Sequence, residues 1–418
     1  MTISDNQKKY MNQESIHGPD NYKPLEVVLS EAKGVWVWDV DQNKYLDMMS
    51  AYSAVSHGHA HPELVKVFRD QSETLSLTSR AFYTNTLGPY LETITKMTGF
   101  EMALPMNSGA EAVETAIKSS RRWAYRTKKV EENKAEIIVA EGNFHGRTTT
   151  IISFSTDENS RKDFGPHTPG FVAVEYGSSK AIEDAITPNT AAVIIEPIQG
   201  EGGIIVPPDN YLNEVRAICT KHNVLMILDE IQSGLGRTGK LFAYQHSCGQ
   251  CSCGENLCEV QPDGLILGKA LGGGFMPVSV FLSSEEVLSW MDPGSHGSTF
   301  GGNPLASALA KRSLELLYEE NLIENSRVMG NYFKEQLTAL NSELIVEIRG
   351  MGLWLGVEID QKYISGNELS KTLLEAGILC KETHESTIRF APPLVVTKEE
   401  LDWGIEKIAK VFSEVTKS

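Results

Sequence analysis

The feature that most constrains the fold is a series of short apolar runs that recurs through the middle of the chain. Val and Ile are frequent in these runs, and the segments between several of them are long enough for helices such as Tyr211–His222. The runs are residues 136–140, 151–154, 171–174, 191–195, 224–228 and 264–267. Strands that alternate with helices predict an α/β fold with a mostly parallel, doubly wound sheet, whose ligands bind beyond the carboxyl ends of the strands.

The two ends of the chain carry different patterns. Residues 35–40 and 44–47 predict a hairpin, and Asn303 followed by Pro304 predicts the beginning of a helix that continues to Leu317. Strands are expected at 344–348 and 352–359, before a final amphipathic helix with one face formed by Leu401, Ile405, Ile408 and Phe412. We expect three parts: an N-terminal segment at 1–50 that packs with the small domain, a large domain at 51–312 and a small α+β domain at 313–418.

Composition and charge exclude several classes of partner. The chain has 418 residues and a formal net charge of −17, which argues against nucleic acid or an anionic membrane surface. Residues 1–17 contain no apolar signal segment, and no apolar stretch reaches the roughly 18–20 residues that span a bilayer. The six cysteines are too few for a disulfide scaffold. We therefore expect a cytoplasmic protein.

Two polar residues at the ends of predicted strands could carry covalent chemistry. Lys269 follows the run 264–267 and precedes glycines, so partial desolvation should lower its pKa and make the amine nucleophilic enough for a Schiff base. Asp229 follows the run 224–228, where a carboxylate could keep the ring nitrogen of a pyridine cofactor protonated. Taken singly, a surface lysine and a strand-end cap are the simpler interpretations.

Two segments could bind a phosphate. Residues 107–110, Asn-Ser-Gly-Ala, open a predicted helix, and the free backbone N–H groups at a helix N-terminus bind anions. Residues 297–302, Gly-Ser-Thr-Phe-Gly-Gly, add hydroxyl groups and flexible backbone. A plain N-cap and a glycine-rich loop are the alternatives.

The order of these features along the chain resembles one protein family. The matching stretches extend over most of residues 21–411 and include Leu77-Thr-Ser-Arg-Ala-Phe-Tyr, Pro105-Met-Asn-Ser-Gly-Ala-Glu-Ala, Gly142-Asn-Phe-His-Gly-Arg, Glu196-Pro-Ile-Gln-Gly-Glu-Gly-Gly, Leu228-Asp-Glu-Ile-Gln-Ser-Gly and Arg389-Phe-Ala-Pro-Pro. The chain resembles the class III, fold type I, pyridoxal-phosphate-dependent aminotransferases, and among them the ornithine δ-aminotransferases. The resemblance implies pyridoxal 5′-phosphate as the cofactor and a homodimer, or a higher oligomer, with a shared active site.

The resemblance also implies how the cofactor is held. Lys269 would form the covalent link to the cofactor and shuttle the proton, and Asp229 would pair with the pyridine nitrogen. Gln232 would contact the ring hydroxyl, and Phe144 would stack on the ring. The remaining contacts go to the phosphate and would come from Ser108, Gly109, Ala110 and, from the neighbouring subunit, Ser298 and Thr299.

The same resemblance implies the substrates, an amino acid and a 2-oxo acid. Arg147 and Tyr22 would take the α-carboxylate of ornithine, while Glu201 neutralises Arg389. When 2-oxoglutarate binds, Glu201 would swing aside and Arg389 would take the α-carboxylate. Tyr52 would favour ornithine as the amine. The products of the ping-pong reaction would be glutamate 5-semialdehyde and glutamate. The alternative amines are acetylornithine, lysine and 4-aminobutyrate. The structural alternatives are surface ion pairs for the charged residues and core positions for the two tyrosines.

Residues 234–240, Gly-Leu-Gly-Arg-Thr-Gly-Lys, offer a competing interpretation. They match the glycine-rich P-loop pattern of nucleotide hydrolases. Leu241 stands where that pattern needs Ser or Thr to bind Mg²⁺, and no clear strand and helix flank the motif. We therefore expect no nucleotide hydrolysis.

A cluster of cysteines is not explained by the resemblance. Cys248, Cys251, Cys253 and Cys258 lie in an insertion at about 246–260, between Asp229 and Lys269. Thiolates at this spacing could close a tetrahedral, structural Zn²⁺ site, in which His246 could substitute as a ligand. An iron–sulfur cluster, redox pairing of Cys248 with Cys251, or free thiols in a flexible loop are the alternatives.

Overall fold

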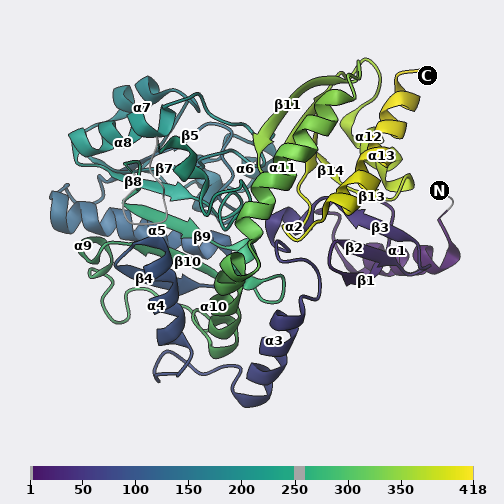
Figure 1. Cartoon of the computed structure of the whole chain (residues 1–418). Coiled ribbons are helices and arrows are strands. Elements are labelled where there is room, and N and C mark those ends of the chain that lie inside the picture. Colours follow the sequence, from purple (N-terminus) through teal and green to yellow (C-terminus); the bar gives the residue numbers. More distant parts are fainter. Residues whose placement is uncertain (1–2, 249–258, 418) are drawn as a thin grey trace.

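The computed structural model describes residues 3–248 and 259–417 and is built around a seven-stranded sheet (Figure 1). The strand order is β4-β10-β9-β8-β7-β5-β6. The strands are β4 (Met102–Met106), β5 (Glu136–Ala140), β6 (Phe171–Val174), β7 (Thr190–Ile195), β8 (Leu225–Asp229), β9 (Gly264–Leu267) and β10 (Ser279–Ser283). Pairing is parallel from β6 through β9, and only β10 runs antiparallel to its neighbours β9 and β4. The predicted mostly parallel sheet is therefore confirmed.

Both faces of this sheet are covered by helices, as a doubly wound fold requires. In β7, Val193 and Ile195 belong to one buried core together with α8 (Tyr211–His222). Ala192 and Ile194 point the other way, into a second core with α5 (Gly109–Trp123). Because every residue of β7 is buried, this strand reads as a continuous apolar run.

The other helices of this region are short or lie at its edges. They are α3 (Pro62–Thr74), α4 (Leu87–Thr98), η1 (Ala124–Lys128), η2 (Ile151–Phe154), α6 (Glu158–Arg161), α7 (Ser179–Ala185), η3 (Ala243–Ser247), η4 (Lys269–Gly272) and α9 (Glu285–Leu288). The strand predicted at residues 151–154 is wrong, because η2 is a single turn of 3-10 helix. The Thr148 hydroxyl accepts from the Ile151 N–H at 3.2 Å, and a short apolar run has no periodicity that separates a strand from a buried turn.

Two smaller sheets join the ends of the chain. The first has the order β1-β2-β3-β13 and contains β1 (Leu29–Lys33), β2 (Trp36–Asp39), β3 (Lys44–Asp47) and β13 (Ile378–Leu379). The second has the order β11-β12-β15-β14 and contains β11 (Ile345–Met351), β12 (Trp354–Ile359), β15 (Thr387–Phe390) and β14 (Lys381–Thr383). The antiparallel pair β2–β3 confirms the predicted hairpin. The boundaries proposed at residues 50 and 312 stay predictions.

The C-terminal helices follow the expected pattern. They are α10 (Pro304–Glu319), α11 (Leu322–Ala339), α12 (Gly366–Glu375) and α13 (Lys398–Val415), while the N-terminal segment adds α1 (Asp5–His17) and α2 (Ser50–Ser53). Asn303 caps α10 as predicted, because its side chain accepts from the Ala306 N–H. Leu401, Ile408 and Phe412 are buried on one face of α13. In the part of the chain that the structure describes, no helix is long and apolar enough to cross a membrane.

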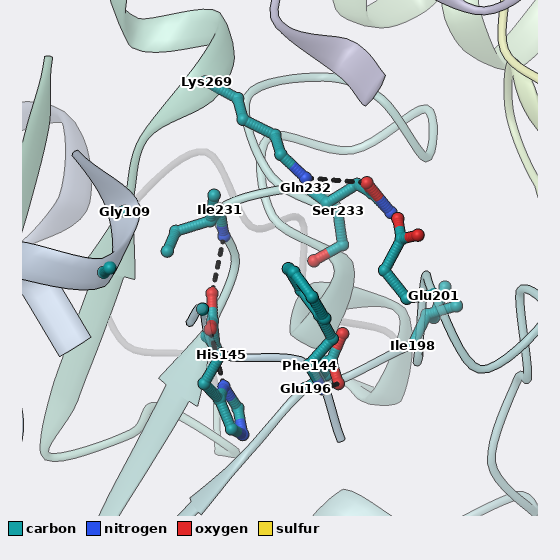
Figure 2. Close-up of a pocket in the computed structure, with 13 residues that line it drawn as sticks. Gly109, Phe144, His145, Glu196, Ile198, Glu201, Ile231, Gln232, Ser233 and Lys269 are labelled. Atoms are coloured by element: carbon teal, nitrogen blue, oxygen red, sulfur yellow. Dashed lines mark hydrogen bonds and ion pairs between the residues drawn. The ribbon is translucent and has the colours of Figure 1, made fainter. Parts of the chain in front are cut away.

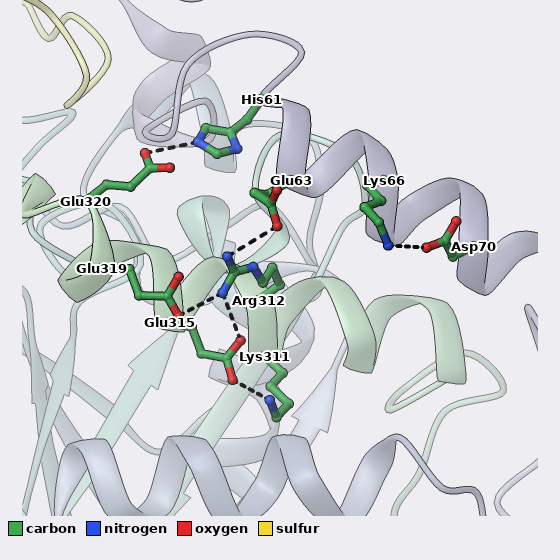
Figure 3. A network of polar contacts seen from close by, with 9 residues as sticks. All are labelled: His61, Glu63, Lys66, Asp70, Lys311, Arg312, Glu315, Glu319 and Glu320. Atoms are coloured by element: carbon green, nitrogen blue, oxygen red, sulfur yellow. Dashed lines mark hydrogen bonds and ion pairs between the residues drawn. The ribbon is translucent and has the colours of Figure 1, made fainter.

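A network of charged side chains links α3 to α10 (Figure 3). Arg312 on α10 lies at its centre and contacts Glu63 of α3 at 3.3 Å and Glu319 at 2.9 Å. His61, at the beginning of α3, contacts Glu320 just after α10. These pairs orient two helices whose apolar faces already pack together, and each partly exposed pair contributes little by itself.

Candidate active site

A cavity of about 200 Å³ lies beyond the carboxyl ends of the central strands (Figure 2). Lys269 reaches it from the segment after β9, Asp229 from the end of β8, and Glu196 from the residue after β7. Phe144 and His145, from the loop after β5, form the wall opposite Lys269. Strands far apart in sequence thus bring these side chains together at the edge where such sheets bind ligands.

Lys269 has the properties of a reactive amine. Burial lowers its pKa to about 8, despite the opposing charge of Glu201. Its Nζ atom donates to Gln232 Oε1 at 2.7 Å, so the amine is already directed into the cavity. The backbone of Lys269 has φ of 43°, a left-handed conformation that is strained for a residue with a side chain and is often found at functional sites.

Asp229 is held on both of its oxygens. Oδ1 accepts from the Ile231 N–H at 3.0 Å, and Oδ2 lies 2.7 Å from His145 Nδ1. Burial alone would lower the pKa of His145, but the hydrogen bond to Asp229 and the charges of Asp229 and Glu196 raise it. This contact fixes the orientation of the Asp229 carboxyl group at the end of β8.

Glu196 and His145 are site residues that the sequence interpretation did not single out. Glu196 accepts from the Phe144 N–H at 3.1 Å and the Gly200 N–H at 3.3 Å. Burial raises the pKa of Glu196 to about 7, assisted by the charge of Asp229 and opposed by that of His145. The available signals were that His145 directly follows Phe144 and that Glu196 directly follows a buried strand.

The N-terminus of α5 borders the same cavity. Ser108 caps this helix in a capping box with Glu111, and Gly109 and Ala110 line the cavity. A Cβ atom on Gly109 would lie 2.9 Å from Ile231 Cδ1, so the glycine lets the helix end approach the floor of the site closely. Helix N-termini of this kind bind anions, and the phosphate contacts of Ser108, Gly109 and Ala110 stay a prediction.

Ser298 and Thr299 do not line the cavity of their own chain. The Ser298 hydroxyl accepts from Asn107 Nδ2 at 2.7 Å, immediately before the cap of α5, while Thr299 is exposed. The structure therefore places Ser298 beside the N-terminus of α5 and Thr299 on the surface.

Arg389 and Glu201 form an ion pair above the cavity. Their Nη1 and Oε1 atoms lie 2.8 Å apart, and the Arg389 side chain is only 3% exposed. Burial opposes ionisation of Glu201, but Arg389, followed by Lys269 and Arg147, lowers the pKa of this carboxyl, which stays charged. The pair thus gives Arg389 a local counter-ion.

Tyr52 lies against both cations of this region. The Arg389 guanidinium is 5.0 Å and Lys269 Nζ is 5.9 Å from the centre of its ring. Tyr52 belongs to α2, in which Ser50, Ala51, Tyr52 and Ser53 all have positive φ. Burial and the charge of Glu201 raise the pKa of Tyr52, so its hydroxyl is neutral.

Arg147 lies outside the lining of this cavity and is exposed. Its Nη1 donates to the Tyr22 hydroxyl at 3.4 Å, and its guanidinium is 5.2 Å from the centre of the Phe144 ring. Tyr22 keeps 65% of its surface exposed. The two residues therefore form an open cationic contact next to Phe144.

Gly200 leaves room for the side chains of Gln232 and Trp354, which both lie close to its backbone. A Cβ atom at this position would lie 2.0 Å from Gln232 Nε2 and 2.9 Å from a ring carbon of Trp354. A side chain at residue 200 would therefore displace Gln232, the hydrogen-bond partner of Lys269.

The P-loop interpretation and the metal interpretation receive no support from the described residues. Residues 234–240 form turns after β8 rather than a strand–loop–helix unit, and Lys240 donates to the Gln245 carbonyl. Cys248 is buried, whereas Cys251, Cys253 and Cys258 lie outside the described residues. Within 3–248 and 259–417, no group of three or more His, Cys, Asp or Glu side chains could hold a metal ion. The zinc site stays a prediction.

Several known proteins resemble the chain over most of its length. The family model described as aminotransferase class-III matches residues 17–412. The ornithine aminotransferase of Brevibacillus brevis is 54% identical over 94% of this chain and 96% of its own length, and that of Bacillus subtilis is 51% identical over 99% of both.

Solved structures give the same result. The crystal structure of the Toxoplasma gondii ornithine aminotransferase has a TM-score of 0.94 and 40% identity, over 98% of this chain and 96% of that one. The acetylornithine aminotransferase of Elizabethkingia anophelis has a TM-score of 0.87 and 42% identity, over 98% of this chain and 100% of that one. These similarities confirm the fold type I architecture. The chain belongs to the class-III aminotransferase family.

Proposed function

We propose that the chain transfers the δ-amino group of L-ornithine to 2-oxoglutarate with pyridoxal 5′-phosphate as cofactor. The products are glutamate 5-semialdehyde, which cyclises to pyrroline-5-carboxylate, and glutamate. Relatives named ornithine aminotransferase, 51–54% identical over nearly the whole chain, support this function. The observation that carries it is the Glu201–Arg389 pair beside Tyr52, because this arrangement can present a masked cation to one substrate and a free cation to the other.

The residues around the cavity fit this cofactor. Pyridoxal phosphate supplies an aldehyde and a pyridinium ring that withdraws electrons from the substrate carbon. The free N–H groups of Gly109 and Ala110 suit its phosphate, and Phe144 offers an aromatic face for its ring. Asp229, which His145 orients through the 2.7 Å contact, offers a carboxyl partner for a protonated ring nitrogen.

Lys269 performs the proton transfers. With a pKa of about 8, a far larger fraction of its amine is neutral near neutral pH than for an ordinary lysine, and this fraction can act as a nucleophile or a base. Gln232 orients the amine through the 2.7 Å hydrogen bond, and the rigid left-handed backbone limits where Nζ can reach. Lys269 Nζ would thus accept and hold the proton that the substrate carbon loses, while the cofactor would supply the electron-withdrawing ring.

Ornithine is oriented from its α end. Arg147 and Tyr22 bind the α-carboxylate, because a guanidinium fork matches the two carboxylate oxygens. Glu201 masks Arg389, so the α-carboxylate gains little there and the δ-amine points to Lys269. The neutral Tyr52 hydroxyl accepts a hydrogen bond from the α-amino group.

2-Oxoglutarate uses the same cations in another way. Its γ-carboxylate takes the place of the ornithine carboxylate at Arg147. Its α-carboxylate displaces Glu201 and pairs with Arg389, which brings the keto carbon to the cofactor. Glu201 is 31% exposed, so it can turn toward solvent, where water replaces its contact with Arg389.

We also propose a homodimer with a shared site. Phe82, Tyr83 and Phe300 are exposed aromatic residues, and the segments that carry them adjoin, since the Leu305 N–H donates to the Ser76 carbonyl. A second copy that covers this surface would bury it and bring Ser298 and Thr299 toward the partner's phosphate.

The cellular setting is part of the proposal. We propose that the chain serves arginine metabolism and proline biosynthesis, to which its proposed substrates belong, and that it does so in the cytoplasm. Elemental analysis of the purified protein tests the separate prediction of zinc at Cys248, Cys251, Cys253 and Cys258.

A panel of amines tests the proposed function. The holoenzyme is mixed in turn with ornithine, N-acetylornithine, lysine and 4-aminobutyrate, and the loss of the visible absorbance of the cofactor is followed by stopped flow. Ornithine should react with the highest kcat/KM and yield pyrroline-5-carboxylate. A higher kcat/KM for any other amine would refute ornithine as the substrate.

A further inference from the structure

The segment 234–240 has no place in the proposed reaction, yet it contains a fully buried cation. Arg237 is 0% exposed. Among the described residues it forms no ion pair, and its guanidinium donates to the carbonyls of Leu353 and Pro392 and to the hydroxyl of Ser56. Burying a cation without a carboxylate is unfavourable, so the structure must gain something from these bonds.

The two carbonyls lie at one end of the central strand pair, β12 and β15, of the second small sheet. Leu353 precedes β12, and Pro392 follows β15 by two residues. These strands pair antiparallel, with Gly356 opposite Arg389, so the beginning of one lies beside the end of the other. A single nitrogen, Arg237 Nη1, contacts both carbonyls, at 3.0 and 2.5 Å. Arg237 therefore binds both strands of the pair just beyond Arg389.

The backbone around Arg237 is locked to the same end of this strand pair. The Ser326 hydroxyl donates to the Arg237 carbonyl at 2.9 Å and accepts from the Leu353 N–H at 3.2 Å. A Cβ atom on Gly352 would lie 2.4 Å from the carbonyl carbon of Thr238, so the two segments are in backbone contact. The loop after β8 and this end of the β12–β15 pair cannot slide past each other.

This loop also carries the cofactor side of the site. Asp229 ends β8, and Gln232, which binds Lys269, lies five residues before Arg237 in the sequence. Arg147 comes from a separate segment after β5, and no hydrogen bond between described residues links it to Arg237. The contacts of Arg237 thus connect the cofactor side with Arg389 and leave Arg147 untouched.

We infer that Arg237 is a positioning residue that fixes Arg389 relative to Lys269 and thereby sets the affinity for the dicarboxylate substrate. This inference rests on the proposed function only in that Arg389 receives a substrate carboxylate. The guanidinium is suited to the task because its planar fork can contact several acceptors at once, whereas a lysine ammonium is a flexible point charge. A small displacement of Arg389 separates it from a carboxylate that Arg147 holds at the other end.

Arg237→Lys tests the inference through the two half-reactions. Stopped-flow measurements of the first half-reaction give the apparent Kd for ornithine. The second half-reaction starts from enzyme that has taken up the amino group of ornithine, and it gives the apparent Kd for 2-oxoglutarate. We expect the Kd for 2-oxoglutarate to rise by about 10-fold, because misplacing a binding group by a fraction of an ångström is costly. The Kd for ornithine should change far less. Calorimetry with glutarate, a dicarboxylate that cannot react, should show the same loss.

Two further variants keep the result interpretable. Arg216→Lys is the control, because Arg216 on α8 also binds a backbone carbonyl, that of Gln261, and pairs with Asp263 before β9 of the seven-stranded sheet, far from β12 and β15. It should leave both Kd values unchanged. If Arg237→Lys does not fold, Ser326→Ala loosens the same contact without removing a charge and should weaken glutarate binding selectively.

The outcomes separate the inference from the proposed function. Equal weakening of both half-reactions by Arg237→Lys, or an unchanged affinity for glutarate, would overturn the positioning role. Wild-type enzyme that fails to react with ornithine would instead refute the proposed function, and glutarate calorimetry would still report on Arg237.

Discussion

Replacing Glu201 by glutamine tests whether this residue controls which substrate reaches Arg389. The variant keeps the size of the side chain but removes the negative charge that lies 2.8 Å from the guanidinium. Arg389 then faces the substrate without its counter-ion. We expect 2-oxoglutarate to bind more tightly and ornithine to bind in two orientations.

The magnitude follows from the contact that 2-oxoglutarate no longer has to break. A hydrogen bond between charged groups contributes roughly 1.5–3 kcal/mol. Glu201 is 31% exposed, so the lower end of that range applies. Since about 1.4 kcal/mol corresponds to a factor of ten, the Kd for 2-oxoglutarate should fall about 10-fold.

Product analysis gives the second readout. With Arg389 unmasked, some ornithine should bind its α-carboxylate there and present its α-amine to Lys269. The product should then include the cyclic imine of the 2-oxo acid beside pyrroline-5-carboxylate, and NMR distinguishes the two. Glu347→Gln removes an exposed carboxylate that pairs with Arg349 on the same small sheet, and it should change neither quantity. Unchanged oxo-acid affinity and a single product in Glu201→Gln would refute the switch.

Three substitutions and one pH profile test the rest of the site. Lys269→Ala should abolish the visible absorbance of the covalently bound cofactor, and an unaltered spectrum would exclude this lysine. In the wild type, the rate at which apoenzyme regains that absorbance should rise with pH and level off above about 8, because the amine loses its proton there; a rate independent of pH would contradict the lowered pKa. Tyr52→Ile should shift the ratio of kcat/KM values from ornithine toward 4-aminobutyrate, and a constant ratio would remove Tyr52 from substrate selection. Gly200→Ala should lower kcat by about 10²-fold by displacing Gln232, with thermal unfolding as the check that the chain still folds; a kcat close to that of the wild type would contradict the close approach.

Local patterns predicted the elements whose burial and periodicity are strong. The runs at 136–140, 171–174 and 264–267 coincide with β5, β6 and β9, and the helix Tyr211–His222 has the expected bounds. The antiparallel strand β10 was not predicted, and nothing local reveals its direction. The two-residue strand β13 pairs with β3 across more than 300 residues, so no local pattern could indicate it.

The site was predictable to the extent that strand ends indicate it. Lys269 and Asp229 stand out because each follows a buried strand in a fold whose ligands bind there. Glu201 and Arg389 are 188 residues apart, and only the resemblance to a family paired them. His145 and Glu196 escaped notice because their importance lies in burial and in charges contributed by other segments, which a linear pattern does not contain.

The left-handed run at Ser50–Ser53 has a consequence for how this enzyme could acquire new substrates. Hydrogen bonds from the Met49 and Ser50 N–H groups to Asp47, and from the Ser50 hydroxyl to the Ala391 carbonyl, hold this backbone in place. None of them involves the side chain of Tyr52. Residue 52 can therefore vary without removing any of these hydrogen bonds, although its φ of 59° disfavours β-branched side chains. Natural variation at one position could thus alter the choice of amine while the segment that presents it stays anchored.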